Sequence, residues 1–151
     1  MEIVEFRAEH AAAFKALNEA WISRHFTLEP KDREVLDDPH GKIIAEGGRI
    51  FMAVDGGEAV GCVAMIAMRD GGYEVAKMTV REGLRRSGLG KQLMQACIDE
   101  GARLGAPRLY LETNSSLAPA ISLYGAMGFQ HLAPTASPYA RADVFMERPL
   151  P

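Results

Sequence analysis

A short basic segment rich in glycine contains the residues whose types and spacing best suit ligand binding. Gly88 and Gly90 stand one residue apart, with Lys91 directly after them. Arg85 and Arg86 come just before. Glycine lets a backbone approach a ligand closely, and a helix start offers free N–H groups and a partial positive charge. Because a strand-like run precedes the segment and a helix-like pattern follows it, the segment predicts a site for a phosphate-bearing ligand.

Two common phosphate-binding loops do not fit these residues. A Walker-type loop needs a glycine five positions before the glycine-lysine pair and a Ser or Thr after it, but Arg85 and Gln92 stand there. A dinucleotide-binding fingerprint needs a third small residue three positions after the second glycine, and that residue is Leu93. A different kind of phosphate site is therefore indicated.

The pattern Arg85-x-x-Gly88-x-Gly90 resembles the R/Q-x-x-G-x-G/A signature of the GNAT N-acetyltransferase superfamily. The longer run 77–93 is similar to that family's strand, pyrophosphate loop and helix. A second segment, 109–129, resembles the family's other hallmark: an Asn closes a strand, and the next helix carries Leu-Tyr before a final Gly-Phe. Two matches in the right order and separation identify the chain as a member of this family, with acetyl-CoA as the implied co-substrate.

The resemblance implies where acetyl-CoA would bind. The strands expected at 73–80 and 108–113 would run parallel and splay apart at their carboxyl ends, leaving backbone groups that pair with the amides of the pantetheine arm. The pyrophosphate would take the N–H groups of the glycine-rich segment. The co-substrate-binding residues expected on this basis are Met78, Thr79, Val80, Arg85, Arg86, Ser87, Gly88, Leu89, Gly90, Lys91 and Asn114.

Attack of an amine on a thioester requires a base for the amine, and the departing thiolate benefits from an acid. A thiol pKa of about 8.5 makes the leaving group a modest problem at neutral pH. Tyr124 matches the position where the family usually places the general acid. The alternative is a helix aromatic with its hydroxyl at the surface. Asn114 is expected to bind the pantetheine arm, to cap the following helix, or both.

Two carboxylates are candidates for the general base. Two-residue alternation places Glu74 on one strand face with Met78, from where it could act through water. Glu112 lies near the splayed end of the neighbouring strand. Either carboxylate could instead pair with Lys77 or an arginine as a structural group. His25 is a further candidate, although a loop histidine is more often simply solvated.

Hydrophobic periodicity and turn residues predict the elements that hold these groups. Asp55-Gly56-Gly57 and Asp70-Gly71-Gly72 predict two hairpins, and residues 40–48 are expected to form a loop. The expected order is strand 3–6, helix 9–24, helix 30–39, strands 50–54, 59–68 and 73–80, helix 89–105, strand 108–113, helix 117–127, and strands 129–133 and 142–147. This is the order of the GNAT fold: an α/β (α+β) fold with a mixed central sheet of about seven strands, splayed between the fourth and fifth, and about four flanking helices.

Composition limits the other possibilities. The 151 residues suit a single domain spanning the whole chain, and 48% hydrophobic residues are ordinary for a globular protein. A net charge of −3 argues against nucleic-acid or anionic-membrane binding. Cys62 and Cys97 lie in apolar runs, and no spacing suggests a metal site. The N-terminus has no signal-like segment, and no apolar run is long enough to span a membrane, so a cytoplasmic protein is expected.

We therefore expect an acetyl-CoA-dependent N-acetyltransferase that acts on a primary amine of a small molecule or amino acid by direct attack in a ternary complex. Residues 21–40 and 137–141 would line the acceptor side, where Arg141 could hold an anionic group. The alternatives are a CoA-binding regulatory module without turnover and an enzyme that acetylates peptides or proteins. The resemblance also makes a homodimer plausible.

Overall fold

The computed structural model describes residues 1–84 and 87–151, so Arg85 and Arg86 lie outside the described residues. The described chain contains four α-helices and seven strands, and they follow one another in the order predicted from the sequence. The elements are β1 (Glu2–Glu5), η1 (Ala8–His10), α1 (Ala11–His25), α2 (Pro30–Asp37), η2 (His40–Ile44), β2 (Arg49–Asp55), β3 (Glu58–Ala67), β4 (Tyr73–Val80), α3 (Leu89–Arg103), β5 (Arg108–Thr113), α4 (Ala118–Ala126), β6 (Gln130–His131) and β7 (Val144–Pro149).

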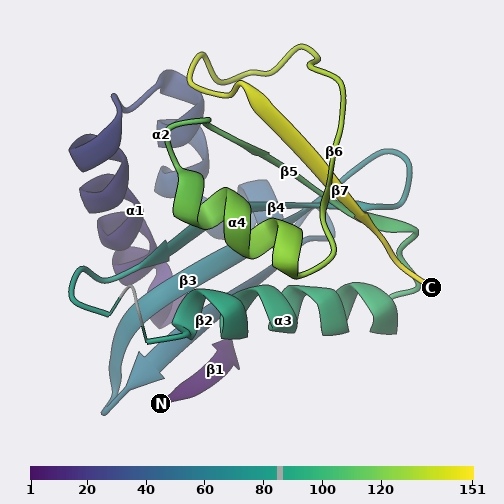
Figure 1. Cartoon of the computed structure of the whole chain (residues 1–151). Helices are drawn as coiled ribbons and strands as arrows, with labels where there is room; N and C mark the ends of the chain where they lie inside the picture. The colour runs from purple at the N-terminus through teal and green to yellow at the C-terminus, as the bar shows by residue number, and fades with distance from the viewer. Residues whose placement is uncertain (85–86) are drawn as a thin grey trace.

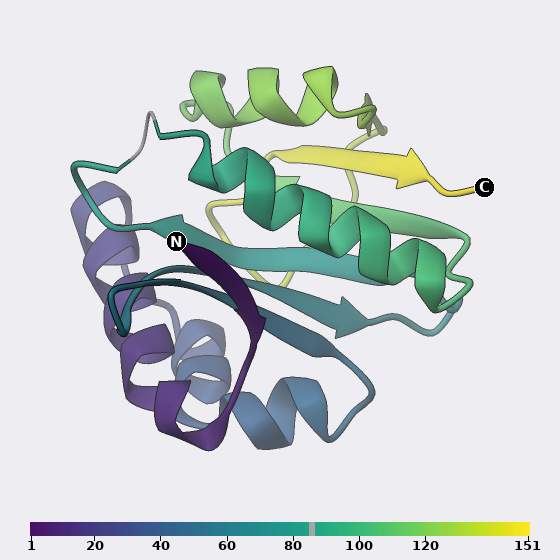
Figure 2. The same cartoon turned by 90° about the horizontal axis from the view of Figure 1, so that it is seen from below.

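All seven strands form one mixed sheet in the order β1-β2-β3-β4-β5-β7-β6. The strands β1 to β4 are antiparallel neighbours, β4 and β5 run parallel, and β7 lies antiparallel between β5 and β6. Figures 1 and 2 show the helices on both sides of this sheet. The mixed sheet with a parallel β4–β5 pair confirms the predicted fold class.

Each face of the sheet carries its own hydrophobic core. On one face, Leu89, Leu93 and Cys97 of α3 pack against alternate residues of β2 to β5. On the other face, Phe14 of α1 and Leu36 of α2 pack against the opposite set of strand residues. Apolar residues at three-to-four spacing give α3 a single buried stripe, which fixes it along the sheet. The two cores place α1 and α3 on opposite sides of β4.

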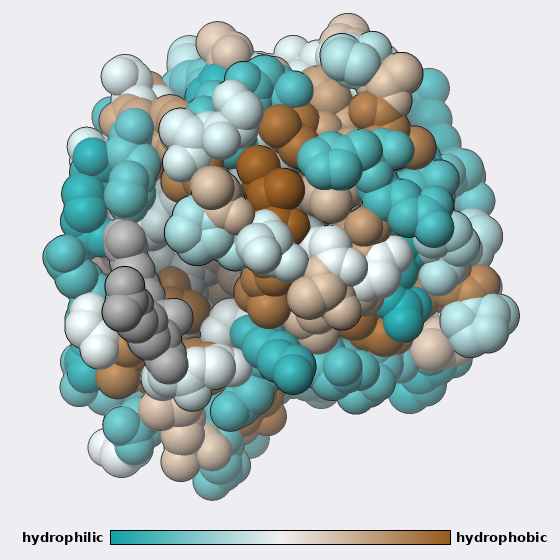
Figure 3. Space-filling model, viewed as in Figure 1, coloured by the Kyte–Doolittle hydropathy of each residue, from teal (hydrophilic) through white to brown (hydrophobic). Residues whose placement is uncertain are grey.

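The surface carries little exposed apolar area. In the described part of the chain, Met1 is the only large apolar residue that is exposed. Figure 3 shows hydrophilic side chains along much of the rim of the molecule, with apolar residues in small groups toward the middle.

The element boundaries differ from the sequence prediction in two places. The segment expected to be a loop contains a π-helical turn, His40–Ile44, whose Ile43 is buried against β2. The last strands are shifted: β6 covers only Gln130–His131, and β7 begins at Val144 rather than at 142. Both hairpins are confirmed, and the pair Asp55↔Glu58 shows the two-residue turn that Gly56-Gly57 predicts.

The predicted splay between β4 and β5 is present. Within these two fully described strands, pairing covers Tyr73↔Leu109 and Glu74↔Tyr110 and then ends. Beyond that point β4 continues alongside β3 as far as Val80, whereas β5 continues alongside β7 as far as Thr113. The carboxyl ends of the two parallel strands therefore part while each stays paired on its other edge.

A β-bulge interrupts β4 just before the splayed end. Thr79 pairs with Cys62, but Ala76 pairs with Ala64, so β4 has one residue more than β3 between these pairs. Lys77, at the bulge, has a φ of 54°, the only positive φ of a non-glycine residue in the described chain. The bulge breaks the two-residue alternation, so the prediction that Glu74 and Met78 share a face was wrong. Glu74 faces α1 and α2, whereas Met78 packs on the α3 side.

Candidate active site

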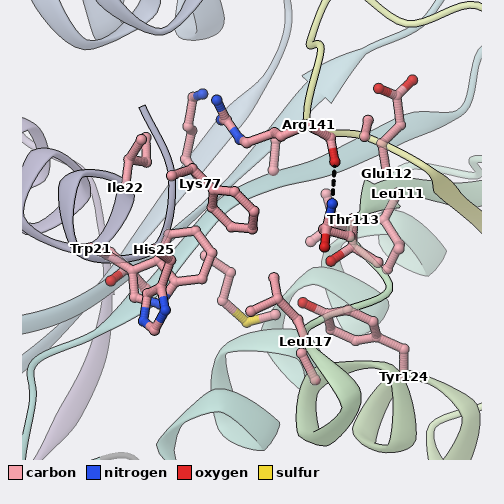
Figure 4. A pocket seen from close by; sticks show the side chains of 18 of the residues that line it. Trp21, Ile22, His25, Lys77, Leu111, Glu112, Thr113, Leu117, Tyr124 and Arg141 are labelled. Carbon is pink, nitrogen blue, oxygen red and sulfur yellow. Dashed lines mark hydrogen bonds between the residues drawn. The ribbon is translucent and has the colours of Figure 1, made fainter. Parts of the chain in front are cut away.

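A cavity of about 650 Å³ lies at the parted ends of β4 and β5. Its walls come from the splayed strands, from α1, from the first half of α4 and from the segment 139–142. Figure 4 shows the α1 side chains Trp21 and His25 on one side of the cavity and Tyr124 and Leu117 on the other. The catalytic residues predicted from the sequence, Tyr124, Glu74 and Glu112, all line this one cavity.

The glycine-rich segment begins α3 at the edge of this cavity. Gly88 is the N-cap of α3 with a φ of 80°, a conformation that glycine adopts at low cost. The side chain of Leu89 lies fully in the core, so only its backbone remains available for a ligand. Of the predicted anion donors, Ser87 N–H donates to the Leu84 carbonyl at 3.1 Å, and Leu89 N–H donates to Ser87 Oγ at 3.3 Å.

Three N–H groups at the start of α3 are candidates for binding an anion. Within the described residues, the backbone N–H groups of Gly88, Gly90 and Lys91 have no hydrogen-bond partner. They lie in the first turn of α3, where the helix dipole favours an anion. The N–H groups at positions 87 and 89 already have internal partners, and the predicted pyrophosphate site at this segment stays a prediction.

The end of β4 presents backbone groups to the gap. Arg81 N–H donates to the Val60 carbonyl at 2.8 Å, and Thr79 pairs with Cys62 one step along the ladder. Because backbone groups alternate in direction along an antiparallel strand, those of Thr79 point to β3, and those of Met78 and Val80 point to the gap. An extended ligand in the gap would therefore pair with Met78 and Val80, while the buried Thr79 supports them from behind.

Tyr124 projects from α4 into the cavity. Its hydroxyl points toward the interior beside Leu117 (Figure 4), and its ring packs against Phe129 with the centroids 6.0 Å apart. The hydroxyl has no hydrogen-bond partner among the residues that the structure describes. Burial raises the pKa of Tyr124 to about 12, so the group is a neutral proton donor at neutral pH. The alternative of a surface hydroxyl is excluded.

Glu74 is a half-buried carboxyl group with no partner. No hydrogen bond or ion pair reaches its carboxylate from residues 1–84 or 87–151. Burial raises its pKa to about 7, the charge of Glu112 adds to this rise, and Lys77 opposes it. A carboxyl group poised near neutral pH can accept a proton and release it again, as a general base must.

Glu112 is held differently. Its carboxylate accepts a hydrogen bond from the Tyr110 hydroxyl at 2.9 Å and another from the Ser137 hydroxyl. The Tyr110 contact confirms that Tyr110 and Glu112 share a face of β5. These two donors hold the Glu112 carboxylate in place at the cavity. Neither glutamate pairs with Lys77, contrary to the structural alternative considered for them.

Asn114 organises the turn between β5 and α4. Its side-chain NH₂ donates to the Arg141 carbonyl at 2.7 Å (Figure 4), and its side-chain oxygen accepts the Ser116 N–H at 2.9 Å. The N-cap of α4 is Leu117, so Asn114 does not cap the helix itself. One amide hydrogen and one lone pair remain for a ligand.

A group of residues that the sequence reasoning missed surrounds Asp32, which is fully buried. Asp32 accepts two hydrogen bonds from the Arg141 guanidinium, at 2.7 and 2.8 Å, and one from Lys77 Nζ at 2.6 Å. Arg141 also contacts Glu29 at 3.1 Å, and Lys77 Nζ lies 3.2 Å from the Tyr139 hydroxyl. We call these five residues the Asp32 cluster. Burial alone would raise the pKa of Asp32, but hydrogen bonds from Arg141 and Lys77 lower it to about 2.

The Asp32 cluster joins three distant segments at one end of the cavity. It ties α2 to the bulge of β4 and to the segment before β7. Arg141 is therefore engaged by two carboxylates of the chain itself, Asp32 and Glu29. The only sequence signals were the position of Asp32 in the first turn after Pro30 and a lysine inside an apolar strand.

The family profile described as "Acetyltransferase (GNAT) family" matches residues 11–129 of the chain. The chain belongs to this family. The membership confirms the resemblance drawn from Arg85-x-x-Gly88-x-Gly90 and from the second segment, although Arg85 and Arg86 themselves lie outside the described residues. The family and the fold are those of acetyl-CoA-dependent N-acetyltransferases.

Individual GNAT relatives agree with this assignment. The chain is 31% identical over 102 residues to YvbK, an uncharacterized N-acetyltransferase of Bacillus subtilis, and the alignment spans 66% of each chain. A GNAT acetyltransferase from Staphylococcus aureus has the same fold, with a TM-score of 0.90, 20% identity and 99% coverage of both chains. The putative acetyltransferase YncA of Salmonella typhimurium, solved with acetyl-CoA, gives a TM-score of 0.80 at 22% identity, covering 100% of this chain and 94% of that one.

The described residues offer neither a metal-binding cluster nor a membrane-spanning helix. They contain no group of three or more His, Cys, Asp and Glu side chains arranged to hold a metal ion. No helix in the same part of this GNAT chain is long and apolar enough to cross a membrane. The expected absence of a metal and the expected cytoplasmic location stay predictions.

Proposed function

We propose that this GNAT protein transfers the acetyl group of acetyl-CoA to a primary amine of a small molecule, by direct attack in a ternary complex. The observation that carries the proposal is that Glu74 and Tyr124 line the same cavity at the parted strands. One is a carboxyl group with a pKa of about 7, and the other is a phenol with a pKa of about 12. They suit the two proton transfers that acetylation requires.

The co-substrate would bind to backbone groups at the start of α3 and at the end of β4. The N–H groups of Gly88, Gly90 and Lys91, which have no partner among the described residues, suit the diphosphate, and the backbone groups of Met78 and Val80 suit the amides of the pantetheine arm. This binding mode needs a gap between β4 and β5, and the two strands do part beyond Glu74. The structure of YncA, which has a similar fold and contains acetyl-CoA, supports acetyl-CoA as the co-substrate.

The reaction then follows from the protonation states of the two side chains. The acceptor ammonium gives one proton to the Glu74 carboxylate, directly or through water, and becomes a neutral amine. The nitrogen lone pair forms a bond to the thioester carbon, and the C–S bond breaks as the carbonyl reforms. The sulfur takes a proton from the Tyr124 hydroxyl, and the second proton of the amine nitrogen passes to solvent, from which the Tyr124 phenolate is reprotonated. The products are an amide, CoA and one released proton.

A small acceptor is favoured over a peptide because the Asp32 cluster covers one end of the cavity. Tyr139 and Arg141 lie over this end and are tied to α2 through Asp32 and Glu29. A peptide substrate would need an open groove across the sheet at this place. The predicted homodimer stays a prediction.

The test is a screen of CoA release from acetyl-CoA with a panel of amines and amino acids, followed by the Tyr124→Phe variant. General acids typically contribute about 10²–10⁴-fold, and because a thiol is an easy leaving group we expect a fall in kcat of about 10–100-fold. The affinity for CoA should be unchanged. Tyr73→Phe is the matched control, because Tyr73 begins β4 away from the cavity.

Two outcomes would contradict the proposal. Tight CoA binding without turnover on any amine would favour a regulatory module, and turnover only with peptides or proteins would favour the other alternative. An unchanged kcat in Tyr124→Phe would remove Tyr124 from the mechanism.

A further inference from the structure

We propose that the preferred acceptor carries a second protonated amino group besides the one that is acetylated, and that Glu112 holds this second cation. The inference rests on the proposed function and narrows its acceptor from any primary amine to a di- or polyamino compound. The inference is based on the charged and hydrogen-bonding groups that line the cavity.

The cations of the cavity wall are already neutralised. Among the described residues, Lys77 and Arg141 are the only lysine and arginine that line the cavity. Lys77 donates to Asp32 at 2.6 Å, and Arg141 shares its guanidinium between Asp32 and Glu29. Their partner carboxylates lie outside the cavity lining, so neither cation presents an uncompensated positive charge to an anionic group of an acceptor.

The carboxylates of the wall are not neutralised. Glu74 and Glu112 both line the cavity, and no lysine or arginine of the described chain forms an ion pair with either. The register pair Glu74↔Tyr110 and the bond from Tyr110 to Glu112 place the two carboxyl groups close together on the sheet face toward α1. Their mutual repulsion contributes to the raised pKa of Glu74. A bound cation would relieve it.

Asn18 offers a further hydrogen-bond acceptor to a ligand in the cavity. Its side chain is 2% exposed and lines the cavity from α1. The NH₂ group donates to the Phe14 carbonyl at 2.9 Å and contacts Cys62 Sγ at 3.4 Å. No hydrogen bond reaches its Oδ1 from the described residues. No described side-chain nitrogen or oxygen atom is both buried and without a partner, so Oδ1 keeps contact with the cavity. An ammonium or a neutral amine in the cavity can donate a hydrogen bond to it.

The division of roles follows from how each carboxylate is held. Glu74 has no partner, so it can take up and release the proton of the reacting amine. The two hydroxyl donors of Glu112 hold its carboxylate in place, while each of its oxygens retains a lone pair for an ammonium group. The remaining titratable groups on the wall are His25, Tyr124 and Tyr139. An acceptor with a carboxylate in place of the second amine would face two like charges.

The experiment compares three acceptors of equal length with acetyl-CoA and the full chain: an unbranched diamine, the matching alkylamine and the matching ω-amino acid, each with four to six carbons. A hydrogen bond between charged groups predicts a kcat/KM for the diamine at least about tenfold above that of the alkylamine, mainly through KM. The ω-amino acid should be the poorest of the three.

The variant Glu112→Gln tests the assigned residue. The ratio of the diamine to the alkylamine kcat/KM should fall by about tenfold, toward one, whatever the effect on the absolute rates. Glu34→Gln is the control, since it removes one negative charge from the exposed side of α2. This control should keep the full ratio.

The outcomes separate this inference from the proposed function. Equal use of the diamine and the alkylamine, or preference for the ω-amino acid, would overturn the inference while leaving an N-acetyltransferase. An unchanged ratio in Glu112→Gln would overturn the role of Glu112. A lack of turnover with every amine would instead count against the proposed function itself.

Discussion

The two ends of the cavity are built in different ways. The end that we propose for the co-substrate, Met78–Val80 together with Ser87–Lys91, comes from one short run of sequence, and the groups proposed to bind belong to the backbone. The other end depends on side chains from segments far apart in the chain, with Asp32 at its centre. The comparison teaches that the co-substrate end is determined by local conformation, whereas the acceptor end is determined by charge pairing across the fold. Each end should therefore respond to a different kind of change.

The largest effect is expected at Glu74. Replacing it in Glu74→Gln removes the proposed base, and general bases typically contribute about 10²–10⁴-fold, so kcat should fall by that order with CoA binding intact. Steady-state rates and calorimetric CoA titration measure both quantities.

The same variant has a built-in folding control. The pKa of Glu74 is raised from its ordinary value to about 7, so its contribution to stability is present below pH 4.5 and is lost as the pH rises through about 7. Glu74→Gln should therefore be at least as stable as the parent at pH 8. A marked loss of stability would mean that the carboxylate has a structural role.

Asp32→Ala tests the charge pairing at the acceptor end. Removing one partner of a buried ion pair leaves uncompensated charges, so the free energy of unfolding should fall by about 3–5 kcal/mol in denaturant titrations. Asp37→Ala on the same helix breaks an exposed pair with Lys15, which should cost about 0–1 kcal/mol. Equal losses in the two variants would contradict the central role of the Asp32 cluster.

The expected change of kcat/KM with pH is smaller than the effect of replacing Glu74. The base must be ionised, so kcat/KM should rise about tenfold between pH 6 and pH 8 as Glu74 loses its proton with a pKa of about 7. In Glu74→Gln this step should disappear, leaving only the titration of the acceptor amine. A profile that is the same in both proteins would assign the step to another group.

The smallest effect is expected at the co-substrate end. Gly88 and Gly105 both have positive φ, and an added Cβ would meet nothing within 4 Å at either position. Gly88→Ala and Gly105→Ala should each cost about 1–2 kcal/mol of stability through backbone strain. Only Gly88→Ala should also weaken CoA binding, because it distorts the N–H groups at the start of α3. Equal affinity in the two variants would count against the assigned loop.

The sequence predicted the features that local patterns determine. The hairpin at Gly56-Gly57, the apolar stripe of α3 and the glycine-rich helix start were all correct, because each depends on residues within one or two turns. The splay followed from the family resemblance rather than from any residue pattern. Tyr124 was found through its motif, and its buried hydroxyl agrees with the predicted acid role without testing it.

The features that the sequence did not predict depend on contacts between residues far apart in the chain. The pair of Asp32 and Arg141 spans 109 positions, and no periodicity links them. The bulge at Lys77 moved Glu74 to the opposite face from Met78, which strict alternation could not anticipate. The pKa of Glu74 depends on burial by segments from the whole chain, so the residue could be nominated but its chemistry could not be derived.

The short parallel contact between β4 and β5 has a consequence for ligand-linked stability. Two register pairs hold the edges of the antiparallel group β1–β4 and of the group β5–β7 together. A molecule that fills the gap adds hydrogen bonds between the two groups and binds only the folded chain, so it should raise the melting temperature with concentration. Amide hydrogen exchange should slow most in residues 78–80 and at the end of β5, even though much of each strand is already paired on its other side.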